Sequence, residues 1–502
     1  MRDERFVDLN SVLMTANLLV AGGIALLFTQ VKDSPYIDRT TLTLGLVLCA
    51  QTQLALWHEK YRRDALVIFI AGVMIIYYAL RLCTLTLYPY SLVFDRYPYT
   101  PADSNRALVF ILIANLALYA GCYCVKSRVN QTVSAAGWRP TSPGRAIFLL
   151  LVAIIVGYAT IHYRADEESS SLASLLGFLI EPGTVIMMAL TYYLLFRNSL
   201  SHTFKVAIAG LLAIEMILHT LAGSRSALVV FIESCAMVVL AINGRIRFRR
   251  KTLVLTLALA PVIVALLIGS FVISTFNRGQ RQAQGMASFS VTEAFTLAKE
   301  SGVTELALGP ALDIWLAPMF ARVGFFDFSA EIIAHRREYA SVLNPTAYAE
   351  SIVDNVLTPG FDVYDQPKTG NALQFLYREV GTPSKIALAE MYQSDQLGVY
   401  GELYGLFGWY SLPLFFLTTY MLKLAFLGMR STNPFTFAMK RVIVLYVLFD
   451  ILNSFGIDWT ILEALGLIAA LFIYGFFFRA TPSAHGAPKS ESFGAATGAL
   501  SS

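Results

Sequence analysis

Apolar residues gather along the chain in twelve long stretches that are separated by shorter polar segments. A helix needs about 20 mostly apolar residues to cross a hydrocarbon core of about 30 Å, and each stretch meets or nearly meets that length. No small-residue cleavage site follows the first stretch, so we interpret it as a retained helix and not as a signal peptide. The pattern predicts an all-α polytopic membrane protein with about twelve transmembrane helices, near residues 10–30, 41–57, 65–86, 106–125, 146–163, 173–196, 205–222, 227–243, 253–274, 401–427, 441–457 and 460–478.

The distribution of Lys and Arg predicts the orientation of these helices, because cytoplasmic loops are enriched in both residues. With a cytoplasmic N-terminus, the inside segments hold 21 Lys and Arg residues and the short outside loops hold six. We therefore expect both termini in the cytoplasm. The segment after Arg479 is rich in Ala, Gly and Ser and is expected to be a disordered tail.

One connection is much longer than the others and is expected on the outer side of the membrane. Its segments "ALDIWLAPMFARVGFFDFSAEIIAH" and "NALQFLYREV" carry apolar residues at helical spacing, which predicts short helices packed on the outer mouth of the bundle. It is not expected to contain a thirteenth span, because Asp313, Arg322 and Asp327 would be costly at the bilayer centre. The predicted organisation is an N-terminal bundle at 1–274, an outer loop domain at 275–400, C-terminal helices at 401–479 and a tail at 480–502.

The composition supports a membrane protein and excludes several other classes. Hydrophobic residues make up 56% of the chain and charged residues 14%, against roughly 25% charged in ordinary soluble domains. The net charge of +4 is too small to indicate nucleic acid binding. All five cysteines fall in or at the end of apolar stretches, which predicts neither a disulfide framework nor a zinc site.

Charged residues inside the apolar stretches are expected in the outer half of the membrane. Arg225, in "LAGSRSALVVF", separates two apolar runs. Its simplest role is an ion pair with Glu215 or Glu233, or contact with lipid headgroups. Glu181 and His219 are predicted at the same level.

The long outer loop adds a group of arginines that these simple roles do not explain. Positive residues are normally depleted outside, yet the loop carries Arg278, Arg281, Arg322, Arg336, Arg337 and Arg378. Such a group is typical of a site for a multiply charged anion, since the planar guanidinium forms paired hydrogen bonds with phosphate oxygens. His335 is a further ligand candidate, although a structural loop histidine is the simpler interpretation.

Several motifs resemble those of bacterial O-antigen and exopolysaccharide repeat-unit polymerases of the Wzy type. The resemblance covers about residues 205–430 and rests on "GSR" at Gly223–Arg225, an arginine-bearing helix exit before one large outer loop, "ARVGFFD" and "GELYGLFGWYSLPL". It implies an architecture similar to that of C-type glycosyltransferases in a bacterial inner membrane. The implied reaction joins oligosaccharides carried on polyprenyl pyrophosphate, on the periplasmic face and without a nucleotide sugar. A flippase and a chain-length regulator of the same pathway are implied as partners, beside membrane lipid.

The resemblance also assigns roles to residues of this chain. Arg225, Arg278 and Arg281, with one or more of Arg322, Arg336, Arg337 and Arg378, would bind the donor pyrophosphate and stabilise the charge that develops as it leaves. A carboxylate should accept the proton of the attacking hydroxyl, and we expect Glu402 or, second, Glu390 in this role. A carboxylate near a helix N-terminus is also stabilised by the helix dipole, so the position of Glu402 does not require a catalytic role. The glycines beside it, Gly401, Gly405 and Gly408, would let this helix pack closely against a neighbour. The outer loop has no DxD motif, so we expect no metal and no cofactor.

Two other functions compete with a polymerase. An O-antigen ligase, which passes the finished chain to a lipopolysaccharide core, is similar in architecture and is poorly separated by sequence. A transporter or lipid flippase is a different class, and internal repeats and charge at the bilayer midplane are typical of it. We detect no repeat between the halves of this chain. A purely structural membrane subunit is the remaining alternative.

Overall fold

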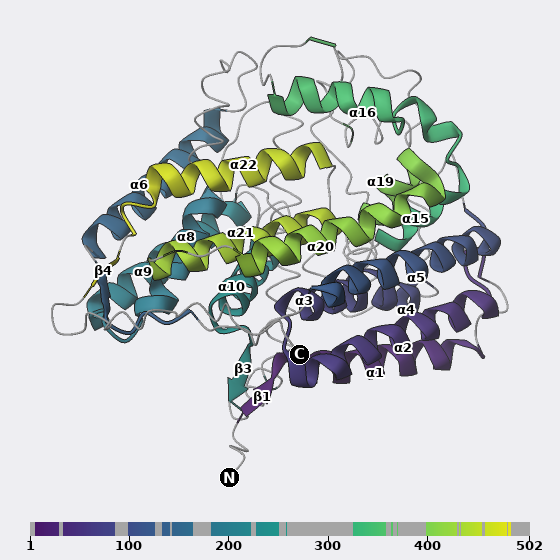
Figure 1. The fold of residues 1–502 in the computed structure, drawn as a ribbon, viewed down its shortest axis with the longest axis horizontal. Coiled ribbons are helices and arrows are strands. Elements are labelled where there is room, and N and C mark those ends of the chain that lie inside the picture. Colours follow the sequence, from purple (N-terminus) through teal and green to yellow (C-terminus); the bar gives the residue numbers. More distant parts are fainter. Residues whose placement is uncertain are drawn as a thin grey trace, which may run out of the picture.

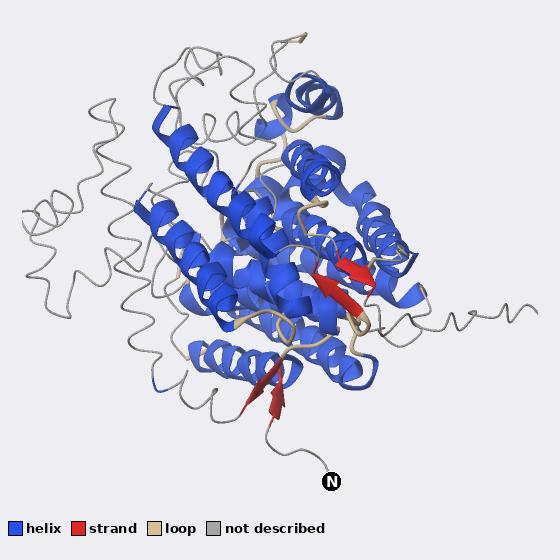
Figure 2. Cartoon of the chain, turned by 90° about the vertical axis from the view of Figure 1, so that its left-hand side faces the viewer, coloured by secondary structure: helices blue, strands red, loops and turns tan. Residues whose placement is uncertain are grey.

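The computed structural model of the protein describes most of the chain outside the long loop and the C-terminal tail. The described residues are 6–29, 34–85, 99–125, 133–140, 143–163, 182–221, 227–249, 258, 325–357, 363–364, 369, 398–428, 431, 433–453, 457–478 and 480–482. Helices make up nearly all of this part, and the strands are confined to two short ribbons (Figure 2).

Helices occupy eleven of the twelve predicted stretches, and the twelfth, 253–274, lies outside the described residues except for position 258. The helices of the N-terminal part are α1 (Leu9–Leu27), α2 (Arg39–Arg62), α3 (Ala65–Val73), η2 (Met74–Ala79), α4 (Leu80–Thr84), α5 (Pro101–Cys124), α6 (Pro143–Tyr163), α8 (Pro182–Phe196), α9 (His202–Leu221) and α10 (Ala227–Asn243). Those that follow are α15 (Phe325–Ala334), η3 (Glu338–Ser341), α16 (Pro345–Ile352), η4 (Val353–Leu357), α19 (Gly398–Phe407), η5 (Gly408–Ser411), α20 (Leu412–Gly428), α21 (Pro434–Leu452) and α22 (Ile457–Tyr474).

Five helical segments of the described chain are long and apolar enough to cross a membrane: 9–27, 39–60, 65–84, 101–124 and 398–428. Shorter apolar helices occupy 143–156, 183–196, 231–243 and 463–474. Large apolar side chains such as Leu19 and Phe472, exposed by 73% and 84%, cover outward faces of the bundle, as expected for contact with lipid. The protein is thus a helical protein with membrane-spanning segments, whereas the total of twelve spans and their orientation stay predictions.

The span predicted at 401–427 is interrupted near its beginning. Helix α19 ends at Phe407, and Gly408 adopts a left-handed backbone conformation with φ of 60°. This conformation favours glycine and commonly ends a helix. The chain continues through η5 into α20, so the predicted single helix is two helices joined by a short 3-10 segment.

Two antiparallel ribbons, which the sequence pattern does not predict, join segments that are far apart in the chain. Strand β1 (Phe6–Asp8) pairs with β3 (Arg247–Arg249), and β2 (Trp138–Pro140) pairs with β4 (Ala480–Pro482). All four strands come from segments or borders that the Lys and Arg distribution assigns to the cytoplasmic side. In Figure 1, β4 lies at the left of the bundle, whereas α15 and α19 lie at its right-hand end.

Polar side chains join the N-terminal helices inside the apolar core. The amide nitrogen of Asn17 in α1 donates to the carbonyl oxygen of Cys49 at 2.8 Å and to Gln53 Oε1 at 2.9 Å, both in α2. Asn115 in α5 donates to Gln51 Oε1 at 2.9 Å. Such bonds between helices hold them together where the surrounding lipid provides little hydrophobic driving force for association. They fix α1, α2 and α5 as one layer (Figure 1).

Candidate functional site

The loop helix α15 and the helix α19 approach each other closely through two glycines spaced four residues apart. A Cβ atom at Gly401 would lie 3.1 Å from Ile332 Cδ1 and 3.2 Å from Ser329 Cα. A Cβ atom at Gly405 would lie 2.6 Å from Leu343 Cδ1 and 3.2 Å from a methyl carbon of Ile332. The close helix packing predicted for Gly401, Gly405 and Gly408 is therefore confirmed for the first two, and the neighbour is the long-loop segment with α15 and Leu343. Gly408 instead lies in a left-handed turn beside the Arg336 side chain.

Glu402 lies on the same helix, at the centre of this packed region. Its side chain is fully buried, and the hydroxyl of Tyr348 in α16 donates a hydrogen bond to Oε1. The carboxylate is thus enclosed by protein in this arrangement. A sugar hydroxyl could reach it only after the surrounding protein had rearranged, so the role of Glu402 as a general base stays a prediction.

A second buried carboxylate, Asp327, binds α15 to the N-terminal helices. Arg81 Nε lies 2.8 Å from Asp327 Oδ2, and the Tyr99 hydroxyl donates to Oδ1 at 2.9 Å. The side chains of Arg81 and Asp327 are 0% and 1% exposed. Asp327 is expected from the sequence to be costly at the bilayer centre, and the structure shows it buried inside the protein. It is buried because Arg81 and Tyr99 supply the positive charge and the hydrogen bond that an isolated carboxylate would lack.

A third buried carboxylate, Glu331, lies one helical turn after Asp327. The hydroxyl of Tyr339 donates to its Oε1, while Oε2 has no hydrogen-bond partner among the described residues. Burial raises the pKa of Glu331 to about 9, and the hydrogen bond from Tyr339 only partly offsets this effect. The raised pKa favours the neutral form of Glu331 at pH 7.

Arg336, a predicted phosphate ligand, binds the backbone at the end of α19. Its Nε donates to the carbonyl oxygen of Gly405 at 3.0 Å, and its Nη2 donates to that of Leu406 at 3.3 Å. The guanidinium carbon also lies 6.0 Å from the centre of the Tyr404 ring. These carbonyl groups end a helix and would otherwise lack partners, so Arg336 has a capping role in the structure.

The other predicted site residues of this segment lie nearby. Arg337 is exposed, and His335 Nδ1 lies 3.9 Å from Glu338 Oε1. The remaining predicted ligands and the second candidate base lie outside the described residues: Arg225, Arg278, Arg281, Arg322, Arg378 and Glu390. Asp313 and Glu181 also lie outside them.

Two acidic residues predicted in the outer half of the membrane lie in the described chain. Glu215 in α9 is 3% exposed. Glu233 in α10 accepts a hydrogen bond from the Tyr77 hydroxyl at 3.0 Å. Tyr77 belongs to η2, a π-helical turn, and such turns are frequent at functional sites.

Sequence reasoning missed the buried ionic residues of the N-terminal helices. Arg81 is the only Lys or Arg in the predicted stretch 65–86, and an ionisable residue inside an apolar stretch is a signal of function or of ion pairing. Lys423 in α20 is likewise buried and pairs with Asp64, which caps the N-terminus of α3. Neither partner could have been found from the sequence, because each lies more than 200 residues from its counterpart.

The described site therefore combines three buried carboxylates, Asp327, Glu331 and Glu402, with phenolic donors and one buried arginine. No group of three or more His, Cys, Asp and Glu residues within the described ranges could hold a metal ion. The prediction that the protein uses no metal stays a prediction.

No family model, curated protein or solved structure matches the chain. The functional interpretation therefore depends on the residues of the chain itself.

Proposed function

We propose that the protein polymerises oligosaccharide repeat units carried on polyprenyl pyrophosphate, at the membrane face opposite its termini and in a bacterial inner membrane. The growing chain would be transferred from its lipid pyrophosphate to a hydroxyl on the terminal sugar of a fresh lipid-linked unit. The long-loop arginines would bind the departing pyrophosphate, and a carboxylate would accept the proton of the attacking hydroxyl.

One observation supports this proposal most directly. The motifs "ARVGFFD" and "GELYGLFGWYSLPL", which carry the resemblance to repeat-unit polymerases, are more than 70 residues apart in the sequence. The described part of the first motif, Phe325–Asp327, begins α15, and the second motif begins within α19. The two helices pack together through Gly401 and Ser329. The packing brings the two motif segments into one region, at the end of the bundle opposite β4 (Figure 1).

The proposal can be tested with purified protein and lipid-linked repeat units, followed by separation of the products by length on a gel. We expect a ladder of polymers. Arg225→Ala and Arg281→Ala should each leave the protein folded and inserted and abolish the long products, because one preorganised donor commonly contributes a few kcal/mol to a charged transition state. Arg197→Ala is the matched control, since this exposed arginine follows α8 in a loop predicted on the cytoplasmic side, and it should keep the ladder.

Three results would contradict the proposal. Normal product length in both arginine variants would exclude the pyrophosphate role. Transfer of a preformed chain to a lipopolysaccharide core acceptor, without a ladder, would indicate a ligase. Movement of labelled lipid across vesicles, without a change in chain length, would indicate a transporter.

A further inference from the structure

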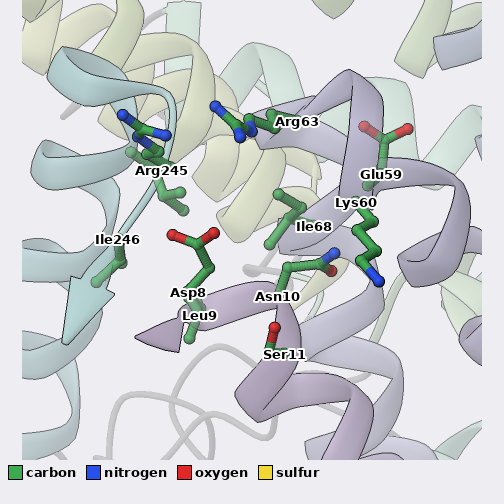
Figure 3. Close-up of a pocket in the computed structure, with 11 residues that line it drawn as sticks. Asp8, Leu9, Asn10, Ser11, Glu59, Lys60, Arg63, Ile68, Arg245 and Ile246 are labelled. Atoms are coloured by element: carbon green, nitrogen blue, oxygen red, sulfur yellow. The ribbon is translucent and has the colours of Figure 1, made fainter. Parts of the chain in front are cut away.

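Helix α10 carries a partly exposed carboxylate, Glu233, in the half that the sequence predicts on the outer side of the membrane. Glu233 lies in the second turn of α10, about 9 Å along the helix axis from the first residue, Ala227. The helix ends at Asn243, about 15 Å further along. Arg245 and Ile246 follow there, beside the ends of α1 and α2 (Figure 3). The carboxylate is thus well separated from the basic end of its helix.

Side chains from two other segments surround this carboxylate. The Tyr77 hydroxyl in η2 donates to Glu233 Oε1 at 3.0 Å, and the side-chain amide of Asn453, directly after α21, interacts with the same hydroxyl. Asn453 Oδ1 is buried and has no hydrogen-bond partner among the described residues, so protein atoms alone do not satisfy this polar group. An ionisable residue inside an apolar helix is costly and indicates a functional site.

Tyr77 also joins Glu233 to the region of the proposed polymerase site. The Tyr77 ring packs against the ring of Phe325, with 4.8 Å between the ring centres. Phe325 begins α15 and belongs to the motif "ARVGFFD". On the other side, Arg225, a proposed pyrophosphate ligand, comes just before α10 in the sequence. Glu233 therefore lies close to both segments that the proposed function requires.

The position of Glu233 along α10 suits a base that works opposite a departing pyrophosphate. In inverting glycoside hydrolases the two carboxyl groups on either side of the scissile bond are about 6.5–9.5 Å apart, which leaves room for the attacking group. The rise of about 9 Å from the start of α10 to Glu233 is of this size. Glu233 is also partly exposed, whereas Glu402 is fully buried. A sugar hydroxyl can therefore reach Glu233 more readily than Glu402.

We propose that Glu233, oriented by the Tyr77 hydroxyl, accepts the proton of the attacking sugar hydroxyl. This inference rests on the proposed polymerase function. The hydroxyl oxygen forms a bond to the anomeric carbon of the growing chain while its proton passes to the Glu233 carboxylate. The bond from that carbon to the pyrophosphate oxygen breaks, and its electron pair leaves with the lipid pyrophosphate. Glu233 then returns the proton to water before the next cycle.

The test measures two quantities with the purified full chain: the rate of transfer between lipid-linked repeat units in a single turnover, and the Kd for polyprenyl pyrophosphate. Glu233→Gln keeps the size of the side chain and an acceptor for Tyr77. It should lower the rate at least about a hundredfold, because it removes the base, and leave the Kd within about twofold of the native value. Glu233→Asp keeps a carboxylate and should react at least about tenfold faster than Glu233→Gln.

Two further variants separate catalysis from packing. Tyr77→Phe should lower the rate about tenfold without changing the Kd, because the carboxylate remains but loses the hydrogen bond that orients it. The matched control is Glu463→Gln, since Glu463 is also a partly exposed carboxylate in an apolar helix and accepts a hydrogen bond from the Tyr446 hydroxyl. It should keep the native rate.

The outcomes distinguish this inference from the function on which it rests. A native protein that makes no polymer overturns the polymerase proposal and the inference with it. If the native protein makes polymer and Glu233→Gln reacts within about tenfold of its rate, only the inference is wrong. It is also wrong if the Kd for polyprenyl pyrophosphate weakens as much as the rate falls, since Glu233 would then serve donor binding, or if Glu463→Gln loses as much activity as Glu233→Gln.

Discussion

The ion pair between Arg81 and Asp327 should contribute strongly to the attachment of α15, and the structure gives the size of the effect. Both side chains are buried, and the Nε to Oδ2 distance is 2.8 Å. Removing one partner leaves an uncompensated charge in the protein interior, which costs about 3–5 kcal/mol. Arg81→Met and Asp327→Leu should therefore each lower the free energy of unfolding by about that amount.

The double variant should lower the free energy of unfolding by much less than the sum of the two single-variant effects. It leaves no buried charge, and its main defect is the Tyr99 hydroxyl, which loses its acceptor at a cost of about 1–3 kcal/mol. Titration of the detergent-solubilised protein with a denaturing detergent, followed by circular dichroism, measures these free energies. The matched control is Arg106→Met on α5, which removes the 54% exposed partner of Asp103, leaves the capping box of that carboxylate intact and should cost less than about 1 kcal/mol. The reasoning would be refuted if the double variant lost as much unfolding free energy as the two single variants together. It would also be refuted if each single variant lost no more than the control.

Two further predictions concern the same region. Burial raises the pKa of Glu331 to about 9 in the folded protein. In the unfolded chain the same carboxyl group ionises from about pH 4.5 upward. The free energy of unfolding therefore falls by up to about 1.4 kcal/mol per pH unit between these two values. Glu331→Gln should remove this loss, and its Tm advantage over the native protein should increase from about pH 5 to about pH 8; an advantage independent of pH would contradict the raised pKa. Gly401→Ala should lower Tm, since its Cβ would lie 3.1 Å from Ile332 Cδ1, whereas Gly210→Ala in α9, with open space around the added atom, should raise it through the helix preference of alanine. Equal shifts in the two glycine variants would show that α15 and α19 do not pack closely.

The helices could be predicted from the sequence because the apolar runs are long and the turns between them carry clear signals. The capping box at Thr100 and Asp103, with proline at the first position of α5, is one local example. The break at Gly408 was less predictable, because three glycines in this segment serve different purposes. Gly401 and Gly405 allow close packing, whereas only Gly408 adopts a left-handed conformation.

Contacts between residues that are far apart in the sequence could not be predicted, and the physical reason is different. An ion pair such as Arg81 with Asp327 depends on where two helices meet, and periodicity within each helix contains no information about that meeting. The ribbon of β1 with β3 is only three residues long on each strand and joins the N-terminal segment to a loop more than 200 residues away. Arg336 shows the same difficulty, since an exposed arginine in a loop suits a phosphate site and a helix cap equally well until the carbonyl groups of α19 are placed beside it.

These contacts change how the segment "GELYGLFGWYSLPL" should be interpreted. Gly401 and Gly405 permit helix packing, Glu402 accepts a hydrogen bond from Tyr348, and Tyr404 packs against the ring of Phe110 with 4.8 Å between the ring centres. Each of these residues thus has a structural role that requires no catalysis. Loss of polymer in a Glu402 variant would follow equally from loosening α19 against α15, so such a result alone would not identify a base. Arg225 and Arg281 are more informative positions, because their proposed role depends on charge at the substrate and Arg197 provides a matched charge change in a loop predicted on the cytoplasmic side. A polymerase that depends on a pyrophosphate site should therefore respond to the charge at positions 225 and 281 while its stability stays unchanged.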